Sequence, residues 1–215
     1  TVVEHKTIDL NGSNRYKGFG TMSEYLVTAT AVGMFEDCPR KWGWRYLEGL
    51  KVQNAAAQRG DAVHKLLEAW LKKKTPPPAD EHGKLARALI PLLPPPQAVE
   101  GKFVEVEMLM ALGGVKFIGK IDLYDQRKKP PTIYDHKTTS DLVWALTPDR
   151  MPSDIQASLY AAWGLTFSKA EEVRLCWNYV RTRGSAQTLP VSRLVRDRDN
   201  KERVSKTIET DQQIL

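Results

Sequence analysis

Cysteine is scarce in this sequence, which has only Cys38 and Cys176 among its 215 residues. Two thiols are too few for a disulfide scaffold or a four-cysteine metal site, so both are predicted to be reduced. Long apolar runs are also missing, because none approaches the roughly 20 residues that a membrane-spanning helix needs. The first residues show no signal-sequence pattern. These absences predict a soluble, cytoplasmic protein with no membrane partner.

Positive charge is only weakly in excess, since the sequence has 32 lysines and arginines and 26 aspartates and glutamates. The net charge of +6 suits a polyanionic partner but is ordinary for a solvated protein of this size. A hydrophobic content of 41% over this length is enough for one core. We therefore expect a single domain at 31–215, preceded by an arm at 1–30 in which glycines and polar residues show no sustained period.

Helical periodicity is clearest from Ala55 to Lys74, where apolar residues recur at three-and-four spacing as in an amphipathic helix. Another helical stretch is expected at 31–50, interrupted near Pro39, which can open a new helix. The proline runs TPPPAD and PLLPPP bracket a short helix from Glu81 to about Ile90. They predict a helical insertion at about 75–98.

After the proline runs the apolar period changes to two, as in β-strands. Residues 103–112 and 115–125 flank Gly113 and Gly114, which predicts a β-hairpin with a diglycine turn. Further elements are expected in the order strand, helix, strand, strand, at 132–138, 153–167, 173–180 and 188–195, before a charged tail. This mixture of helices and strands predicts an α/β fold.

Asp135 and Lys137 stand two apart in the third predicted strand, so both side chains leave one face of the sheet while His136 points away. The carboxylate can bind a divalent cation. The lysine can orient or help deprotonate a water and offset charge on a phosphate. A cross-strand salt bridge is the alternative interpretation of this pair.

Asp122 interrupts the preceding predicted strand at a position where aspartate is disfavoured. If the two strands are neighbours, Asp122 stands beside Asp135, and two such carboxylates repel unless a cation lies between them. A solvent-exposed aspartate is the alternative. Gly119 either lets another backbone or a ligand approach closely or marks a bulge. Glu105 and Glu107 offer a further acid or are solvated, and a supporting role is favoured for Glu107.

His64 lies at the edge of the apolar stripe of its predicted helix, with Gly60 one turn before it and Glu68 one turn after. It can therefore project toward a neighbouring sheet surface. A neutral imidazole is a good metal ligand, although a packed or hydrogen-bonded histidine explains the position as well.

Gln156 and Tyr160 are four apart and share a face of the predicted helix at 153–167. An amide and a phenol presented together can both contact a phosphate. Ser153 and Gln156 also match a helix-opening box, and Tyr160 suits the core, so both interpretations stay open.

The segments RGDAVHKLLEAW, GKIDLYD, YDHKTT and DIQASLY follow one another in the order and spacing of the motifs of RecB-like nucleases. The sequence thus resembles the RecB-like exonuclease branch of the PD-(D/E)XK superfamily. The segment CPRKWGWRYLEGL resembles the N-terminal segment of that family, so the resemblance runs from about Thr30 to Val180. It implies a restriction-endonuclease-like core, in which helices flank a mixed central β-sheet.

The resemblance also implies the members of an active site. Mg²⁺ or Mn²⁺ is expected to bind His64, Asp122 and Asp135, with Lys137 at the attacking water. Hydrolysis of a phosphodiester by such a site leaves a 5′-phosphate and a 3′-hydroxyl and needs no covalent intermediate.

Contacts with DNA are implied for Gln156 and Tyr160. Other basic residues that could grip phosphates are Arg40, Lys41, Arg45 and Arg59. Trp42 or Trp44 could stack on bases, although exposed charges beside buried aromatic residues are the more frequent arrangement.

Some relatives of this kind carry an iron–sulfur cluster held by one early and three late cysteines. Here only Cys176 follows Cys38, so no such cluster is expected. A Walker A loop is also missing from the sequence, so any helicase or recombination protein that acts with this chain is a separate one. The chain looks similar to small stand-alone phage or prophage nucleases, which places it in a bacterial or phage-infected cell.

The function expected from the residues and the resemblance is a metal-dependent DNA exonuclease in recombination, repair or end processing. One alternative is a catalytically silent DNA- or protein-binding module on the same fold. The complete set of metal-binding carboxylates and lysine argues against it. Another alternative, a structure-specific endonuclease, keeps the chemistry and changes the substrate.

Overall fold

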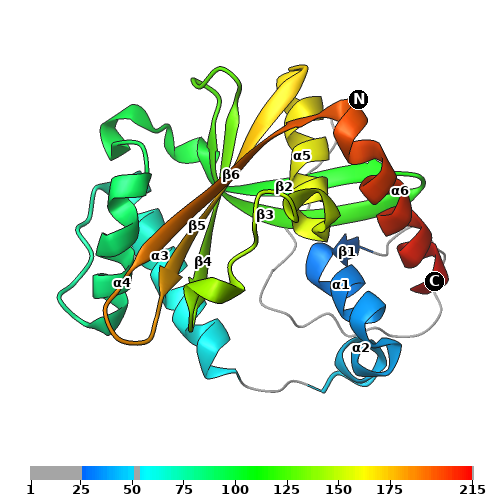
Figure 1. Cartoon of the computed structure of the whole chain (residues 1–215), viewed down its shortest axis with the longest axis horizontal. Coiled ribbons are helices and arrows are strands. Elements are labelled where there is room, and N and C mark those ends of the chain that lie inside the picture. The colour runs from blue at the N-terminus through cyan, green and yellow to red at the C-terminus, as the bar shows by residue number, and fades with distance from the viewer. Residues whose placement is uncertain (1–25, 51–53, 215) are drawn as a thin grey trace, which may run out of the picture.

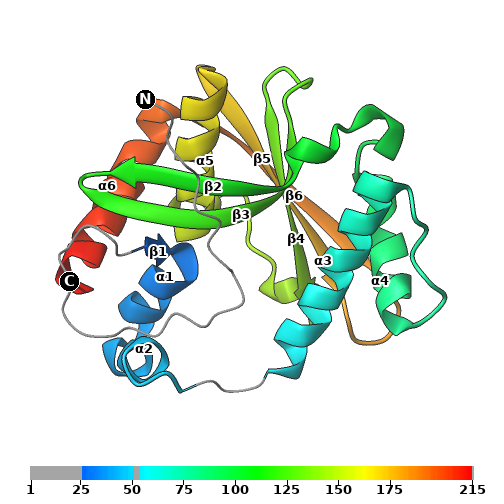
Figure 2. The same ribbon diagram turned by 180° about the vertical axis from the view of Figure 1, so that it is seen from behind.

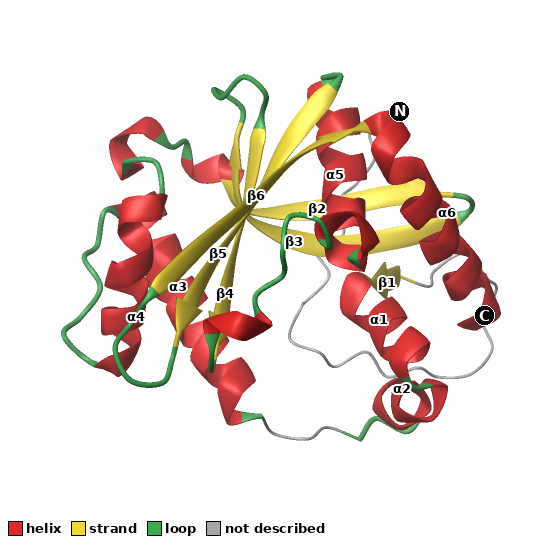
Figure 3. Ribbon diagram, viewed as in Figure 1, coloured by secondary structure: helices red, strands yellow, loops and turns green. Residues whose placement is uncertain are grey.

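The computed structural model describes residues 26–50 and 54–214, and its centre is a six-stranded sheet with helices around it (Figure 1). The strands are β1 (Leu26–Thr28), β2 (Val104–Leu112), β3 (Val115–Asp125), β4 (Thr132–Thr139), β5 (Glu172–Arg181) and β6 (Thr188–Arg196). The helices are α1 (Ala29–Asp37), α2 (Pro39–Tyr46), α3 (Ala55–Lys73), α4 (Glu81–Leu89), α5 (Ile155–Ser168) and α6 (Asp197–Ile214). Short 3₁₀ helices are η1 (Ile90–Leu92), η2 (Pro96–Ala98), η3 (Gly101–Phe103), η4 (Leu142–Trp144) and η5 (Met151–Ser153). The predicted α/β class, a mixed sheet flanked by helices, is confirmed (Figure 3).

Strand β3 uses both of its edges. Along one edge it pairs with β2 as an antiparallel hairpin. Along the other edge, residues 116–118 pair with β1 in parallel and residues 123–125 pair with β4 in antiparallel orientation. Among the described strands, none pairs with residues 119–122 on that second edge. The ladder is thus interrupted between β1 and β4, and β5 and β6 continue the sheet beyond β4.

The hairpin of β2 and β3 turns on the predicted diglycine. Gly113 and Gly114 have φ values of +56° and +84°, a backbone region that L side chains rarely adopt. A Cβ on Gly113 would also lie 2.7 Å from a methyl group of Ile208 in α6. Both residues are therefore glycine for a physical reason, and the two-residue turn determines which residues of β2 and β3 face each other.

Alternating strand residues build a core on each face of the sheet. On the face covered by α5, the fully buried residues include Phe117, Ile133, Leu159 and Trp177. On the face covered by α3 and α4, they include Val63, Leu67, Leu89 and Val180. Both ribbon views show α3 beside α4 at one end of the molecule and α5 beside α6 at the other (Figures 1 and 2).

Most of the predicted elements occur where the sequence indicated. The helix expected from Ala55 to Lys74 is α3, opened by the side chain of Asn54 and ended by Lys74 in the left-handed region. Residues 1–25 of the expected N-terminal arm lie outside the described residues. The rest of that arm contradicts the expectation of loose loops, because residues 26–28 form β1 and Ala29 begins α1. The proposed domain boundaries stay a prediction.

The C-terminal segment is the second difference from the expectation. Residues 197–214 were expected as a charged tail and form helix α6. This helix packs against α1 and α5 largely through polar groups rather than an apolar stripe, which is why its sequence gave no strong helical signal. Asn200 donates from Nδ2 to the Ser158 carbonyl at 2.7 Å. Arg203 forms two bonds of 3.1 and 2.9 Å to the carboxylate of Glu36.

No helix within residues 26–50 and 54–214 combines the length and the apolar character that crossing a bilayer demands.

Candidate active site

The candidate site lies where β3 and β4 part. The ladder between them ends at Leu123 and Tyr134, one residue before Asp122 and Asp135 would face each other. Beyond that point the carboxylate of Asp122 replaces the strand partner, because its Oδ2 accepts the backbone N–H of His136 at 2.6 Å. Both aspartates are buried, with 6% and 2% of their surface exposed. The open ladder thus leaves a backbone N–H group to which a buried carboxylate can bind.

His64 reaches this junction from α3, and both of its ring nitrogens are bonded. Nε2 donates to the carbonyl of His136 at 2.7 Å, since a carbonyl can only accept. Nδ1 lies 3.0 Å from Oδ1 of Asp122. The carbonyl holds the proton on Nε2, so the nitrogen that faces the carboxylate is the one free to bind a metal.

The protonation of His64 follows from these neighbours. Burial alone would lower its pKa, but the hydrogen bond and charge of Asp122 outweigh burial and raise the pKa to about 9. The same pair keeps the pKa of the Asp122 carboxyl below its usual range, although burial opposes this. Without a cation, the two residues therefore form an imidazolium–carboxylate pair. A divalent cation at Nδ1 would replace the imidazole proton.

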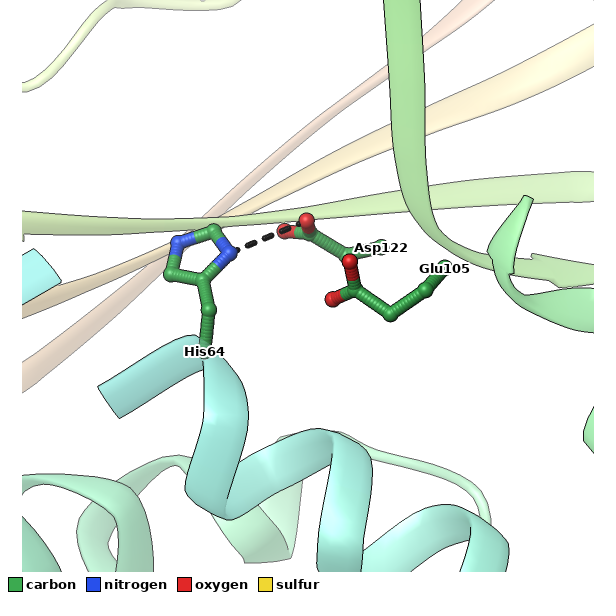
Figure 4. Close-up of side chains that lie close together, drawn as sticks. All are labelled: His64, Glu105 and Asp122. Atoms are coloured by element: carbon green, nitrogen blue, oxygen red, sulfur yellow. Dashed lines mark hydrogen bonds and ion pairs between the residues drawn. The ribbon is translucent and has the colours of Figure 1, made fainter. Parts of the chain in front are cut away.

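Glu105 of β2 completes a compact group of metal-binding atoms. One ligand atom from each of His64, Glu105 and Asp122 lies within 4.8 Å of the other two. Figure 4 shows the carboxylate of Asp122 pointing toward the ring of His64, which rises from α3, and the carboxylate of Glu105 beside that of Asp122. Glu105 adopts φ +55°, an uncommon value for a residue other than glycine. Burial raises the pKa of its carboxyl, and an ion pair of 2.7 Å with Lys120 opposes that rise.

The preference for Glu107 over Glu105 was wrong. Glu107 is exposed, whereas Glu105 is half-buried beside Asp122. The sequence did contain a signal that separates the two. A two-residue turn at 113–114 pairs Val104 with Leu123 and Val106 with Ile121, so Glu105 falls opposite Asp122.

Asp135 and Lys137 of β4 are joined to α5 by a second group of contacts. Lys137 Nζ lies 2.7 Å from Oδ2 of Asp135 and donates to Oε1 of Gln156 at 2.7 Å. Gln156 Nε2 donates in turn to Oδ1 of Asp135 at 3.0 Å and to the Tyr160 hydroxyl at 2.9 Å. Tyr160 donates to the carbonyl of Lys120 in β3 at 2.5 Å. The amide of Gln156 therefore orients the carboxylate and the ammonium together.

Burial and the mutual attraction of Asp135 and Lys137 together set the charge state of this pair. Burial raises the pKa of the Asp135 carboxyl to about 6, an effect that the charge of Lys137 reduces and that of Asp122 reinforces. For Lys137, burial would lower the pKa, but the charge and hydrogen bond of Asp135 outweigh it and raise the pKa. Lys137 is thus a protonated group that donates hydrogen bonds.

The interpretation of Gln156 and Tyr160 changes accordingly. The N-cap of α5 is Asp154, which accepts from the backbone N–H of Ala157, so the helix-opening box of Ser153 and Gln156 is wrong. Direct contact of Tyr160 with DNA is also contradicted, because this residue is 3% exposed and fills the space that Gly119 leaves beside it. Tyr160 supports the acidic strand from inside the protein, whereas Gln156 is half-buried and its contact with DNA stays a prediction.

The other predicted DNA-binding residues lie outside these two groups of contacts. Arg40 is exposed, with its guanidinium 5.0 Å from the centre of the Trp44 ring. Arg59 is one to two turns before His64 in α3 and lies 3.7 Å from Glu81 of α4. Trp42 is only 6% exposed, which excludes it from base stacking in this conformation, whereas Trp44 is 43% exposed.

The residues of this site fit a divalent cation. One imidazole nitrogen and two carboxylates are a donor set that suits Mg²⁺ or Mn²⁺, and the approach of two carboxylates is otherwise repulsive. Asp135 does not belong to the group of atoms within 4.8 Å, because Lys137 and Gln156 engage its oxygens. The expected ligand trio of His64, Asp122 and Asp135 therefore differs from the trio that lies closest together.

The sequence of this chain matches a family model of known proteins. The model for the PD-(D/E)XK nuclease superfamily matches residues 27–99 and 82–213. These segments span well over half of the 215 residues, and the chain belongs to this superfamily. A comparison with curated proteins gives no match.

Solved structures support the fold. The chain is similar to a protein from Eubacterium rectale named "Putative exonuclease", with a TM-score of 0.60 and 16% identity over 97% of this chain and 86% of that one. It is also similar to a protein named SSO0001, with a TM-score of 0.44 and 17% identity over 86% of this chain and 76% of that one. The first similarity shows the fold alone, and the second is too low to carry an argument.

Proposed function

We propose that this member of the superfamily is a DNA exonuclease that depends on Mg²⁺ or Mn²⁺. The observation that carries the proposal is a group of side chains that could hold a cation, with a half-buried lysine on a neighbouring strand. His64, Glu105 and Asp122 form that group, and Lys137 lies on the neighbouring strand, paired with Asp135. This combination suits the hydrolysis of a phosphodiester.

Each residue has a role in the proposed reaction. His64, Glu105 and Asp122 hold the cation, with Asp135 as a further ligand on the adjacent strand. When bound, a divalent cation lowers the pKa of a water and stabilises negative charge on the phosphoryl oxygens. Lys137 donates hydrogen bonds to the water or the phosphate and offsets charge as the bond to the leaving oxygen breaks. Its raised pKa favours the protonated form, which donates hydrogen bonds.

Several observations support DNA as the substrate and ends as the point of attack. The superfamily consists of nucleases, the net charge is +6, and the Eubacterium rectale protein of the same fold is named an exonuclease. Arg40 and Arg59 are the candidates for phosphate contacts away from the cation. The comparisons offer no support for a helicase or recombination partner, so the proposal does not include one.

The test is cleavage of end-labelled linear and covalently closed circular DNA of one sequence, with Mg²⁺, Mn²⁺ or EDTA. We expect cation-dependent digestion of linear DNA only, and a rate about 100-fold lower in Lys137→Ala. Cutting of circles would replace the exonuclease by an endonuclease with the same site. Binding of DNA without any cutting would favour the catalytically silent binding module.

Glu105 and Glu107 provide a matched pair for the metal site. Glu105→Gln should weaken binding of Mn²⁺, measured by calorimetry or paramagnetic relaxation, by about 10-fold or more, because a ligand carboxylate is lost. Glu107→Gln removes the same charge two residues away and should leave the Mn²⁺ affinity unchanged. Equal affinity in both variants would remove Glu105 from the proposed ligand set.

A further inference from the structure

The segment after β4 exposes a tryptophan beside the candidate site. Residues 140–150 connect β4 to η5 and α5, and η4 forms part of this connection. Leu142 packs against the core, whereas Val143 and Trp144 are each 75% exposed. These two adjacent side chains form a small exposed apolar patch after the strand that carries Lys137.

Hydrogen bonds on both sides hold this segment in one conformation. Before the tryptophan, Thr139 donates from Oγ1 to the Asp141 carbonyl at 2.7 Å, and Val143 donates its N–H to Oδ1 of Asp141 at 3.2 Å. After it, Leu146 donates its N–H to the hydroxyl of Tyr179 at 3.0 Å. The indole is thus presented by an ordered turn, which lowers the entropy that stacking on a ligand would cost.

The same contacts place the turn next to Lys137. In the parallel pairing of β4 with β5, Tyr179 is the direct partner of Lys137. The charges of Lys137 and Asp135 both act on the Tyr179 hydroxyl, which anchors the turn. Figure 1 shows the turn at the end of β4, and Thr138 just before it lies close to Gly60 of α3. Trp144 therefore lies two residues before the anchor at Leu146, in the turn that follows the strand of Lys137.

An exposed indole at this position would bind paired and unpaired bases differently. A base pair inside a duplex has both faces covered by its neighbours, so an indole at the phosphate backbone finds no ring to stack on. An unpaired base has a free face, and stacking of aromatic side chains on such bases is tolerant of sequence. The exposed indole therefore favours a strand whose bases are unpaired near the reacting phosphate.

We propose that Trp144 stacks on an unpaired nucleobase of the substrate, so that the enzyme acts on single-stranded DNA or on frayed ends. This inference rests on the proposed nuclease function. It names Trp144 as a residue that determines substrate specificity and takes no part in the bond-breaking step.

Steady-state kinetics on single-stranded and blunt duplex DNA of one sequence test the proposal. We expect wild-type protein to prefer the single strand, and Trp144→Ala to raise its KM for that strand on the order of 10-fold with kcat unchanged. Trp144→Phe should restore most of the affinity because it keeps a ring. Leu109→Ala, which removes another exposed apolar side chain from β2, is the control and should behave as wild type.

A binding measurement separates stacking from other roles of the indole. A single strand containing 2-aminopurine, added to the Lys137→Ala protein, should change fluorescence on binding, and the additional Trp144→Ala substitution should abolish that change. An unaltered KM in Trp144→Ala, or unchanged fluorescence, overturns the inference while cation-dependent cleavage still supports the nuclease. Loss of self-association or of protein binding in Trp144→Ala, with normal kinetics, would assign the indole to a protein interface and also overturn it. Absence of cleavage by wild-type protein on every DNA would reject the proposed function itself.

Discussion

Two buried aspartates of this protein have opposite surroundings. At the junction of β3 and β4, Asp122 accepts hydrogen bonds from His64 and from the backbone of His136. On α6, Asp211 is fully buried, and neither of its oxygens has a hydrogen-bond partner within residues 26–50 and 54–214. The pKa of the Asp122 carboxyl is kept low, whereas burial raises that of Asp211 to about 6.

A carboxylate buried in its ionised form needs hydrogen-bond donors around it. A charge removed from water is tolerated when donors surround it, and the junction of β3 and β4 provides them. The result is a carboxylate that stays ionised at the proposed cation site. Helix α6 offers no such donors to Asp211, so the same group there destabilises the folded state once it ionises.

The largest effect is expected from removing the charge of Asp122, the buried aspartate that has hydrogen-bond partners. Asp122→Asn should lower the rate of DNA cleavage by at least about 100-fold, because a cation ligand and the partner of His64 are lost together. The rate is measured as nucleotide release with saturating Mn²⁺, and circular dichroism checks that the variant is folded. Full activity in this variant would overturn the assignment of the site.

Lys137→Ala is expected to have an effect of similar or smaller size, on the chemical step alone. Loss of its ammonium should reduce kcat by about 100-fold and leave the Mn²⁺ affinity near that of wild type, since no ligand is removed. Single-turnover kinetics and calorimetry measure the two quantities separately. Gln156→Ala, which frees both Asp135 and Lys137, should reduce kcat by about 10-fold. Unchanged turnover in Lys137→Ala would exclude a catalytic role.

Asp211→Asn tests, through its pH dependence, whether ionisation of the buried and unpartnered Asp211 carboxyl destabilises the folded protein. The pKa of about 6 exceeds the ordinary carboxyl value of about 4, so the folded protein holds a proton that the unfolded chain has released. This contribution to stability is complete below about pH 4 and is lost as the pH rises through 6. The variant should therefore have a free energy of unfolding about 2–3 kcal/mol above wild type at pH 8, and about half that gain at pH 5.

Urea denaturation at the two pH values measures this difference. Asp149→Asn is the control, because the Asp149 side chain is 99% exposed and its loss should change stability little at either pH. A gain from Asp211→Asn that is equal at pH 5 and pH 8 would contradict the argument from ionisation.

The smallest effect on stability is expected from removing Arg203, a paired charge on helix α6. Arg203 binds Glu36 through two bonds, and its side chain is 11% exposed. Arg203→Met should lower the free energy of unfolding by about 1–2 kcal/mol. Lys201→Met breaks an exposed pair with Asp197 on the same helix and should cost less than about 0.5 kcal/mol. Equal costs would show that α6 is not held by the Arg203 contact.

Local sequence patterns predicted much of the fold and part of the site. The period of two placed Asp135 and Lys137 on one face of β4, and the diglycine turn set the register of β2 and β3. The apolar stripe of α3 presented His64 to the sheet. These features depend on residues close in sequence, whose geometry follows from the helical or strand period alone.

The positive φ of Glu105, the positions of Gln156 and Tyr160 and the docking of α6 needed the three-dimensional structure. Glu105 approaches Asp122 through a positive φ value that its sequence does not indicate. Tyr160 could equally face DNA or the core, and only the packing of α5 on β3 buries it. Helix α6 has few apolar residues, so its place depends on single polar contacts with α1 and α5.

By itself, the sequence determined the α/β class, the order of the main elements and the residues able to bind a cation or a phosphate. Only the tertiary structure decided which of those residues meet. His64 and Asp122 are 58 residues apart in the chain, and their contact depends on how α3 packs across the opening of β3 and β4. The physical reason is that the faces of an element follow from its local period, whereas contacts between elements follow from packing and from the pairing of buried polar groups.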